Sequence, residues 1–429
     1  MSSDQPPTPR TTVLITLLTV SILASVDRQA MSMLVEPIKA DFGLSDSEVG
    51  FLLGPAFVLL YAVFGILFGL WADRGNRRNI IAAAIAVWSV LTMACGAATG
   101  FVTMALARMG VAVGEAGANP PAYSMISDLY DEHERSTAIG IYSTSGNFGI
   151  LIGFAAAGLI SEAFGWRYTF FFLGAPGLVL ALVVYFGIRE PNRKTTTQQV
   201  GTDIAPPFLT TLSHMLSQRS VRHLVVGGAL AAFVGFGYVS WLPAFFERTF
   251  VDLDRGTIGI GLGLLIGIVG GAGTFLGGYF SDKVGTHDVR WRLYIAVIAI
   301  FLGWPVGAGA LFAGDYLLVL GLMAVPSFVA LFHLATLFAL MQQLVAPRMR
   351  AVATAILMVF TNLIGGGLGP WYVGQVSDLL TDRFGEQSLA YALTSLIVFA
   401  LWSGVHFYLA SRHLVKDLGR TAAGVPEGA

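Results

Sequence analysis

The chain has 429 residues, of which 55% are hydrophobic and only 12% are charged, whereas ordinary soluble domains have roughly 45–50% and about 25%. A mean hydropathy of +0.71 excludes a soluble domain and indicates a protein that crosses a lipid bilayer several times. The net charge of −1 and the lack of a block of like charges argue against nucleic acid as a partner.

Apolar runs of about 20 residues, long enough to cross a bilayer, recur twelve times along the chain and are separated by breaks rich in Gly, Pro or charge. The first run is too long for the core of a signal peptide, so we interpret it as a retained membrane helix. The predicted spans are 11–36, 48–71, 79–98, 101–125, 136–160, 168–188, 221–246, 256–280, 292–312, 315–343, 348–372 and 388–411.

One long break divides these spans into two sets of six. The first half of the break is polar and typical of a linker, and its second half contains FLTTLSHMLSQ, which predicts a short surface helix. We therefore expect five parts: a cytoplasmic tail (1–10), a six-helix bundle (11–188), a cytoplasmic linker (189–220), a second six-helix bundle (221–411) and a cytoplasmic C-terminal tail (412–429).

The basic residues predict the orientation, because Lys and Arg concentrate in cytoplasmic loops. With the N-terminus inside, most of the 25 Lys and Arg residues fall in cytoplasmic segments. We therefore expect both termini inside. The basic residues left in outer loops are Lys39, Arg167, Arg248, Arg255 and Arg383.

A short motif occurs once in each half of the chain. The loop after the second span reads GLWADRGNRR, and the loop after the eighth span reads GYFSDKVG. Both contain Gly, three residues, Asp and a basic residue at the same place in each set of six, which indicates a parallel repeat of the kind found in one large class of transporters. The motif residues that we single out are Gly69, Asp73, Arg74, Arg77, Arg78, Asp282 and Lys283.

In these features the sequence resembles the major facilitator superfamily across essentially the whole chain. The resemblance implies an all-α fold of two six-helix bundles, and it implies that the loop motif is a conformational latch on the cytoplasmic side. Asn76 stands where many members have Gly. The alternative is that these charges only set the topology, and the second copy of the motif favours the latch.

Charged residues are rare in the interiors of the predicted spans. Asp27 and Arg28 lie in the first span, and Arg108 and Glu115 lie in the fourth. A charge at the bilayer centre costs roughly 2.5–3.5 kcal/mol on insertion scales and normally faces a cavity or a partner. These four residues are therefore the first candidates for a functional site.

Helix geometry relates three of these charges to one another. Arg108 and Glu115 are two turns apart on one helical face, roughly 10 Å along the axis, and Asp27 reaches a depth similar to that of Arg108 in a core of roughly 30 Å. We expect Arg108 to pair with either Asp27 or Glu115, depending on which carboxyl group is protonated.

This arrangement predicts a proton switch, because burial disfavours a carboxylate and a nearby guanidinium favours it. Arg108 can also bind a phosphate or carboxylate group in bidentate fashion. The alternative is a static ion pair that fastens two helices. For Arg28 three roles stay open: an ion pair with Asp27, extension toward the membrane surface, or contact with substrate.

The second half of the chain has polar and aromatic residues in its spans instead of charges. The substrate-binding candidates there are Tyr238, Trp241, His333 and Asn362. A charged first half and an apolar, aromatic second half fit an amphipathic substrate with an ionised head. Packing between helices or contact with lipid is the alternative for each of these side chains.

A closer resemblance rests on the stretches DRQAM, DRGNRR, RMGVAVGEA and SDLY. They resemble the spinster branch of the superfamily, whose fourth helix carries Arg, a Gly four residues on, and then Gly-Glu. Gly114 and Glu115 match this pattern, whereas Ala112 occupies the first Gly position. We expect Gly110, Gly114 and Gly117 to keep neighbouring helices close.

The spinster resemblance implies proton-driven export of lysophospholipids or sphingolipid-type phosphates, with Asp27, Arg108 and Glu115 at the coupling positions. We expect a monomeric, proton-coupled secondary transporter in the bacterial inner membrane that moves an amphipathic small molecule or lipid and needs no cofactor and no metal ion.

Two alternatives share this fold. A proton-driven exporter of drugs or organic anions should have a glycine-proline signature in its fifth helix, but SGNFGILIGFAAAG has the glycines without the proline. A passive channel or scramblase is the other alternative, and the duplicated loop motif argues against it. An enzyme is not expected, because no span contains HExxH, GxSxG or a histidine cluster.

Overall fold

The computed structural model describes residues 8–193 and 208–422. Within these ranges the chain is almost entirely helical, and no strand occurs in them. The described residues divide into two compact units. Unit 1 comprises the chain up to residue 193 together with Leu242–Gly267, and unit 2 comprises residues 208–241 and those from Ile268 onward.

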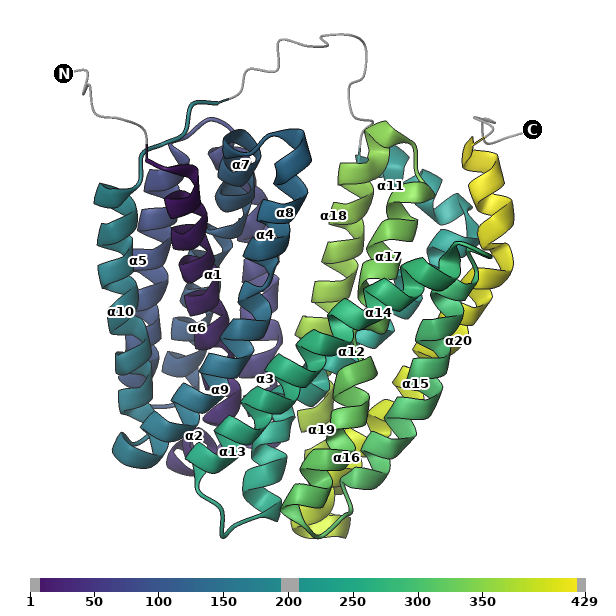
Figure 1. Ribbon diagram of the computed structural model, residues 1–429. Coiled ribbons are helices and arrows are strands. Elements are labelled where there is room, and N and C mark those ends of the chain that lie inside the picture. The colour runs from purple at the N-terminus through teal and green to yellow at the C-terminus, as the bar shows by residue number, and fades with distance from the viewer. Residues whose placement is uncertain (1–7, 194–207, 423–429) are drawn as a thin grey trace, which may run out of the picture. The chain divides into compact units, whose positions relative to one another are not determined.

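Ten of the helices of unit 1 follow one another with short connections (Figure 1), and α13 joins them from later in the chain. They are α1 (Arg10–Met33), α2 (Val35–Phe42), α3 (Asp46–Leu53), α4 (Pro55–Ala72), α5 (Arg77–Gly96), α6 (Phe101–Ala116), α7 (Asn119–Leu129), α8 (Glu132–Ser143), α9 (Ser145–Phe164), α10 (Trp166–Gly187) and α13 (Arg255–Leu262).

Unit 2 contains the remaining helices, and two segments contribute residues to both units. The segments that contribute to both are α12 (Arg219–Thr249) and the π-helical η1 (Gly263–Val269). The others are α11 (Phe208–Ser217), α14 (Gly270–Gly285), α15 (Trp291–Ala310), α16 (Tyr316–Val329), α17 (Phe332–Gln343), η2 (Pro347–Met349), α18 (Arg350–Phe360), η3 (Thr361–Leu368), α19 (Gly369–Phe384), η4 (Gly385–Gln387) and α20 (Ser388–Ala422).

The described residues contain 11 segments that are long and apolar enough to cross a membrane. The last of them, Pro347–Thr421, has 75 residues and covers both of the last two predicted spans, 348–372 and 388–411. The predicted fold of twelve membrane helices is therefore confirmed. The predicted orientation, with both termini inside, and the predicted domain boundaries stay predictions.

The fourth predicted span, 101–125, is not one continuous helix. It consists of α6 and α7, which meet at Gly117 and Ala118. Pro120 and Pro121 follow directly in the first turn of α7, where the missing N–H of proline leaves no hydrogen bond unmade. The break places Glu115 in the last turn of α6 and Asn119 at the start of α7.

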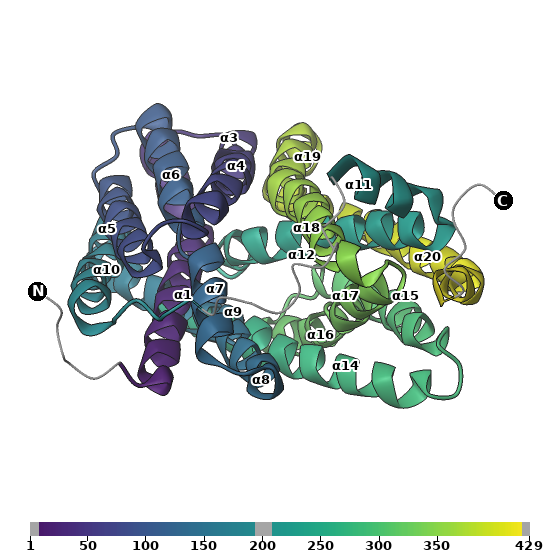
Figure 2. The ribbon, with the colours of Figure 1, turned by 90° about the horizontal axis from the view of Figure 1, so that it is seen from above.

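Close helix packing in unit 1 depends on small residues. α10 lies along α5, and α1 lies along α9 (Figures 1 and 2). α6 also packs on α5, and a Cβ atom added at Gly114 would lie 2.7 Å from the Cβ of Trp88 and 2.8 Å from its backbone nitrogen. Added Cβ atoms at Gly110 and Gly117 would come similarly close to α5, so the predicted role of these glycines is confirmed.

The substitution Gly114→Ala is expected to lower the free energy of unfolding by about 1–3 kcal/mol, the usual cost of overpacking. Thermal unfolding in detergent measures this loss. The matched control is Gly140→Ala, because Gly140 also lies inside a helix and an added Cβ there meets no atom within 4 Å. Equal melting temperatures for the two variants would show that α6 does not need the glycine.

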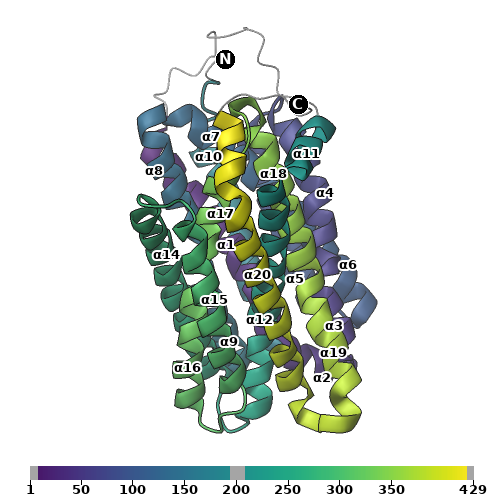
Figure 3. The ribbon, with the colours of Figure 1, turned by 90° about the vertical axis from the view of Figure 1, so that its right-hand side faces the viewer.

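In unit 2, α20 packs along α15 and α19 (Figure 3). The predicted surface helix before the seventh span is confirmed as α11, whereas 194–207 of the expected linker lie outside the described residues. α20 continues to Ala422, well past residue 411. Asp417 fixes this extension, since its Oδ2 accepts hydrogen bonds from the backbone nitrogen (2.9 Å) and hydroxyl (2.7 Å) of Ser220.

Candidate functional site

All four charged residues predicted inside the membrane lie in unit 1, on α1 and α6. Asp27, Arg108 and Glu115 are at most 3% exposed, whereas the side chain of Arg28 is 32% exposed. Arg28 is therefore the one cation of this group that combines a buried carboxylate partner with access from outside.

Glu115 has few partners for a buried carboxylate. Its Oε2 lies 3.4 Å from Nη1 of Arg28, and neither carboxylate oxygen has a hydrogen-bond partner among the described residues. Arg28 also donates from Nη2 to Oγ of Ser25 at 3.3 Å. The structure thus joins α1 to α6 through Arg28 and Glu115, a pair that the sequence analysis did not expect.

The expected pairing of Arg108 with Asp27 or Glu115 is not made in this conformation. The part of the chain that is described gives Arg108 no ion pair, and its Nε has no hydrogen-bond partner. Its guanidinium carbon lies 5.0 Å from the ring centre of Phe57, a favourable cation–π distance. Asp27 accepts a hydrogen bond from Oγ1 of Thr92 at 3.2 Å, and its Oδ1 is unpaired within the described residues.

A chain of uncharged polar side chains lies near Arg28. The hydroxyl of Tyr142 donates to Oδ1 of Asn119 at 2.6 Å, and Nδ2 of Asn119 donates to the hydroxyl oxygen of Tyr61 at 2.8 Å. Tyr61 and Tyr142 both interact electrostatically with Arg28. The sequence analysis missed these residues, although the proline pair after Asn119 was a signal for a helix break with a polar residue at its start.

Arg77 of the repeated loop motif is fully buried within unit 1. It donates from Nε to Oε1 of Glu190 (2.6 Å), and from Nη1 to Oγ of Ser124 (2.9 Å) and to the carboxylate of Asp128. Its Nη2 donates to the carbonyl oxygen of Pro191 at 3.1 Å. Arg77 thus fastens α5 to α7 and to the segment after α10.

The other residues of the first motif copy surround the end of α4. Asp73 is the C-cap of α4, and its backbone nitrogen donates to the carbonyl oxygen of Gly69 at 3.2 Å. Arg193 donates to the carbonyl oxygens of Ala72 (2.7 Å) and Asp73. Arg74 is exposed.

Arg78 donates from its backbone nitrogen to Glu190 and from Nη2 to Oδ1 of Asn79, both at 2.8 Å, whereas the second motif copy makes weaker contacts. The guanidinium of Arg78 lies 5.1 Å from the ring centre of Tyr185. In the second copy Asp282 lies 4.0 Å from Arg292, and Nζ of Lys283 lies 5.9 Å from the ring centre of Tyr279. The predicted latch role of both copies stays a prediction.

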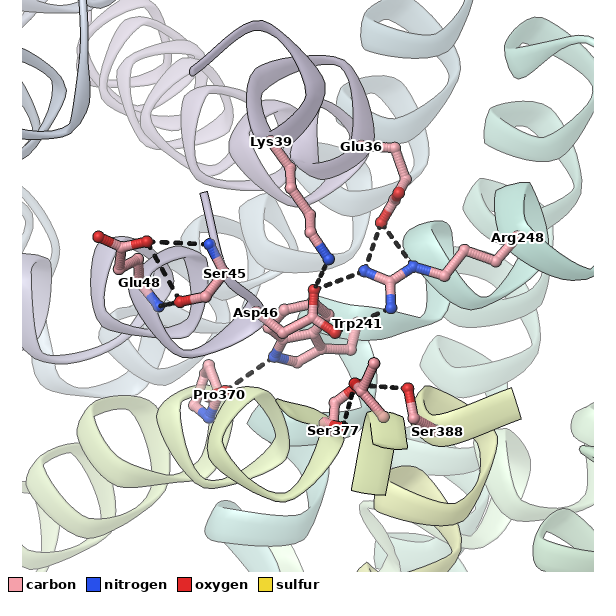
Figure 4. Close-up of polar contacts among 11 residues, drawn as sticks. Glu36, Lys39, Ser45, Asp46, Glu48, Trp241, Arg248, Pro370, Ser377 and Ser388 are labelled. Atoms are coloured by element: carbon pink, nitrogen blue, oxygen red, sulfur yellow. Dashed lines mark hydrogen bonds and ion pairs between the residues drawn. The ribbon is translucent and has the colours of Figure 1, made fainter. Parts of the chain in front are cut away.

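Two of the candidates in unit 2 are held by packing. Trp241 is fully buried, and its Nε1 donates to the carbonyl oxygen of Pro370 at 2.8 Å (Figure 4). His333 is 5% exposed and packs on Phe407, with ring centres 5.3 Å apart. These contacts favour the packing interpretation for both side chains.

The other two candidates are less constrained: Tyr238 has an unpaired hydroxyl within the described residues, and Asn362 has an exposed side chain. Tyr238 is 6% exposed and packs edge-on against Trp304, but its hydroxyl has no hydrogen-bond partner in the described ranges. Asn362 is exposed in the π-helical η3, where Nδ2 donates to the carbonyl oxygen of Met358 at 2.9 Å. Either side chain is able to contact a ligand.

A second group of charges in unit 1 gathers around Arg248, near the end of α12 (Figure 4). Arg248 donates to both carboxylate oxygens of Asp46 at 2.8 and 2.7 Å, and to Oε1 of Glu36 at 2.8 Å from Nε. Lys39 also pairs with Asp46, whose side chain is only 2% exposed. The sequence analysis counted Lys39 and Arg248 only as loop charges and missed this cluster.

Metal binding has no support in the described residues, where no group of three or more His, Cys, Asp or Glu side chains is arranged to hold an ion.

The comparisons with known proteins agree with this architecture. A model of the Major Facilitator Superfamily matches residues 17–370. The MFS-type efflux pump of Mycolicibacterium smegmatis is 32% identical over 400 residues, which cover 93% of this chain and 92% of that protein. Human protein spinster homolog 1 is 24% identical over 386 residues, which cover 84% of this chain and 72% of that protein.

A solved structure of a spinster homolog has the same fold. The crystal structure of a bacterial homolog of the human lysosomal transporter spinster, in an inward-facing and unoccupied conformation, superposes with a TM-score of 0.88 at 28% identity. It covers 97% of this chain and 99% of that one.

The apolar segments of the described residues, the family match and the similarity to known transporters indicate a polytopic membrane transporter rather than an enzyme. The chain belongs to the Major Facilitator Superfamily, and within it the chain is similar to spinster-type transporters. It is an integral protein of the inner membrane. The family resemblance inferred from the loop motif and the fourth span is therefore confirmed.

Proposed function

We propose that the chain is a proton-coupled secondary transporter that moves an amphipathic substrate with an anionic head by alternating access. The observation that carries this proposal is the state of Glu115. It is 1% exposed, no hydrogen bond from the described residues reaches its oxygens, and its ion-pair partner is Arg28 at 3.4 Å.

A buried carboxylate held by one ion pair is well suited to gain and lose a proton. Desolvation disfavours its charged form, and the guanidinium opposite favours that form. Protonation of Glu115 therefore removes the charge that holds Arg28, and departure of Arg28 makes protonation easier. This mutual dependence links a proton to the contact between α1 and α6.

Asp27 and Arg108 complete the proposed coupling group. Asp27 has one unpaired oxygen, and Arg108 has an unpaired Nε. Because unpaired buried polar atoms are costly, we expect these two side chains to gain partners in another state of the transport cycle. Arg108 then pairs with Asp27, as the helix depths predict, or contacts the substrate.

The substrate class follows from the chemistry of the candidates. Two arginines are able to bind phosphate or carboxylate oxygens, and Tyr238 in unit 2 packs against the aromatic ring of Trp304. A lysophospholipid or a sphingolipid-like phosphate has both an anionic head and an apolar body. The similarity to human spinster homolog 1 and to the bacterial spinster homolog supports this class.

Transport by the purified protein in lipid vesicles tests the proposal, with lysophosphatidic acid as the probe and an imposed pH gradient. Wild-type transport should rise with the gradient, whereas Glu115→Gln and Asp27→Asn should transport at a rate that no longer depends on it. Glu134→Gln is the matched control, because Glu134 is 48% exposed and pairs with Arg10 at the surface. Wild-type gradient dependence in both Glu115→Gln and Asp27→Asn would contradict proton coupling through this group.

A proton-driven exporter of drugs or organic anions is the second candidate. The 32% identity to a protein named MFS-type efflux pump favours it. Competition distinguishes the two candidates: a cationic dye such as ethidium should inhibit uptake of the lysolipid only in a drug exporter. If ethidium is itself transported and lysophosphatidic acid is not, the anionic-head proposal is wrong.

A further inference from the structure

The hydrogen bonds around Asn119 run in one direction, from Tyr142 through Asn119 to Tyr61. Asn119 sits at the start of α7, directly after the break in the fourth span. Its Oδ1 accepts from the hydroxyl of Tyr142 at 2.6 Å, and its Nδ2 donates to the oxygen of Tyr61 at 2.8 Å. Both ends of the amide are therefore occupied, which fixes the position of the side chain.

This direction leaves the hydrogen of the Tyr61 hydroxyl free. A phenol has one O–H to donate and also accepts hydrogen bonds, and here the oxygen accepts from Asn119. The guanidinium of Arg28 also makes a hydrogen bond with Tyr61, and because arginine only donates, the Tyr61 oxygen is again the acceptor. Tyr61 is half-buried on α4, and it interacts electrostatically with Arg28. A free O–H donor therefore lies close to a partly exposed guanidinium.

The same place lacks a strong acceptor for Arg28. Glu115 lies 3.4 Å from Nη1 and makes no hydrogen bond with it. The hydrogen bonds of Arg28 to Ser25, at 3.3 Å, and to Tyr61 involve neutral hydroxyls. A charge-assisted N–H···O bond is normally shorter, about 2.7–2.9 Å. Arg28 thus has spare donor capacity, and Tyr61 adds one more donor next to it.

We propose that Arg28 and the hydroxyl of Tyr61 bind the anionic head of the substrate, that Asn119 is the positioning residue that orients Tyr61, and that the head replaces Glu115 on Arg28. This inference rests on the proposed function and adds to it the residues that recognise the head. The ligand is an anionic group with at least two acceptor oxygens, a phosphate or a carboxylate, so that one oxygen meets Arg28 and another meets Tyr61.

Competition between the head and Glu115 gives the site a pH dependence. The charged groups that interact with Arg28 are Glu115 from α6 and Asp27 from α1, and Arg108 from α6 interacts with both of these carboxyl groups. The hydroxyls of Tyr61 and Tyr142, which lie on α4 and α8, complete the surroundings of Arg28. A charged Glu115 holds Arg28, whereas a protonated Glu115 leaves it to the ligand. Binding of an anionic ligand should therefore strengthen as the pH falls through the range in which Glu115 takes up its proton.

Binding to the purified full-length chain in detergent tests these statements. The probes are lysophosphatidic acid, a fatty acid of equal chain length and the uncharged monoacylglycerol. We expect Tyr61→Phe to weaken binding of the anionic probes roughly tenfold or more, as for loss of a hydrogen bond to a charged group, and to leave monoacylglycerol binding unchanged. Comparison of the two anionic probes shows whether the site prefers phosphate or carboxylate.

The matched control is Tyr123→Phe. Tyr123 also lies near Tyr142, with ring centres 5.1 Å apart, but it is 41% exposed. This variant should bind all three probes like the wild type. If Tyr61→Phe also binds both anionic probes like the wild type, the inference is overturned.

A double-mutant cycle tests the positioning role of Asn119. Asn119→Ala alone should weaken anionic binding, but it should have no further effect in the Tyr61→Phe background, because its influence passes through Tyr61. A purely structural role would instead weaken binding of the uncharged probe as well, or add to the effect of Tyr61→Phe. If Asn119→Ala does not fold, Tyr142→Phe replaces it in the cycle, because this variant removes the hydroxyl that donates to Asn119.

The competition step has its own readout. Glu115→Gln should bind the anionic probes more tightly than the wild type at high pH and should lose the pH dependence of binding. If Glu115→Gln and Asp27→Asn lose the gradient response in transport but Tyr61→Phe binds the anionic probes normally, only this inference is overturned. Normal gradient response in both Glu115→Gln and Asp27→Asn, together with weakened binding by Tyr61→Phe, overturns only proton coupling. Failure of the wild type to bind either anionic probe overturns the assignment of the site and of the substrate class.

Discussion

Replacing Arg77 with alanine is expected to lower the free energy of unfolding by about 3–5 kcal/mol, the cost of breaking a buried ion pair by removing one partner. Arg77 is fully buried and is the partner of two carboxylates, those of Asp128 and Glu190. After the substitution both carboxylates lose their main cation, and the space of the guanidinium stays empty. Chemical denaturation in detergent micelles measures the loss.

The neighbouring arginine of the same motif is the control. Arg74 is exposed, so Arg74→Ala should change the stability by less than about 0.5 kcal/mol, as is usual at the surface. Arg77→Lys should be intermediate, because it keeps the charge but loses the planar set of donors. Equal stability of Arg77→Ala and Arg74→Ala would contradict the structural role of this network.

The Arg77 result also bears on the latch hypothesis. The sequence analysis treated Arg74, Arg77 and Arg78 as equivalent loop charges, but the structure gives Arg77 four partners inside unit 1. We therefore expect Arg77→Ala to impair transport mainly through loss of folded protein. Arg74 and Asp73 remain the residues whose substitution should change the transport rate at normal stability.

Hydropathy and charge were sufficient to predict the fold and to single out the charged residues inside the membrane helices. A span of about 20 apolar residues has few alternatives in a bilayer, and Asp27, Arg28, Arg108 and Glu115 stand out because charges are so rare there. The same logic cannot find Tyr61, Asn119 and Tyr142, since uncharged polar side chains are tolerated in membrane helices and do not disturb the hydropathy pattern.

The sequence could not predict that Glu115 pairs with Arg28 instead of Arg108, and the reason is geometric. Counting residues along a helix gives the depth of Asp27 and Arg108, but it does not give the rotation of α1 against α6. That rotation brings Arg28, one residue beyond Asp27, to Glu115 at 3.4 Å. Asp46 and Arg248 illustrate the same limit at long range, because 202 positions separate them in the chain and only the folded unit brings them together.

The substitution Arg248→Ala is expected to lower the free energy of unfolding by about 3 kcal/mol, toward the lower end of the range for a broken buried ion pair. The reason is Asp46, whose side chain is 2% exposed and receives two hydrogen bonds from Arg248. The loss should stay at the lower end because Lys39 remains as a second partner of Asp46. Arg383→Ala, at an exposed arginine, is the control and should have little effect.

The double variant Arg248→Ala/Asp46→Asn separates the unpaired charge from the lost contacts. Removing the carboxylate charge from a buried site that has lost its arginine removes most of the desolvation cost, so the double variant should be more stable than Arg248→Ala alone. Chemical denaturation of both variants and of Asp46→Asn completes the cycle. If the double variant is as unstable as the sum of the two single variants, the sites act independently, and Arg248 does not hold the end of α12 through Asp46.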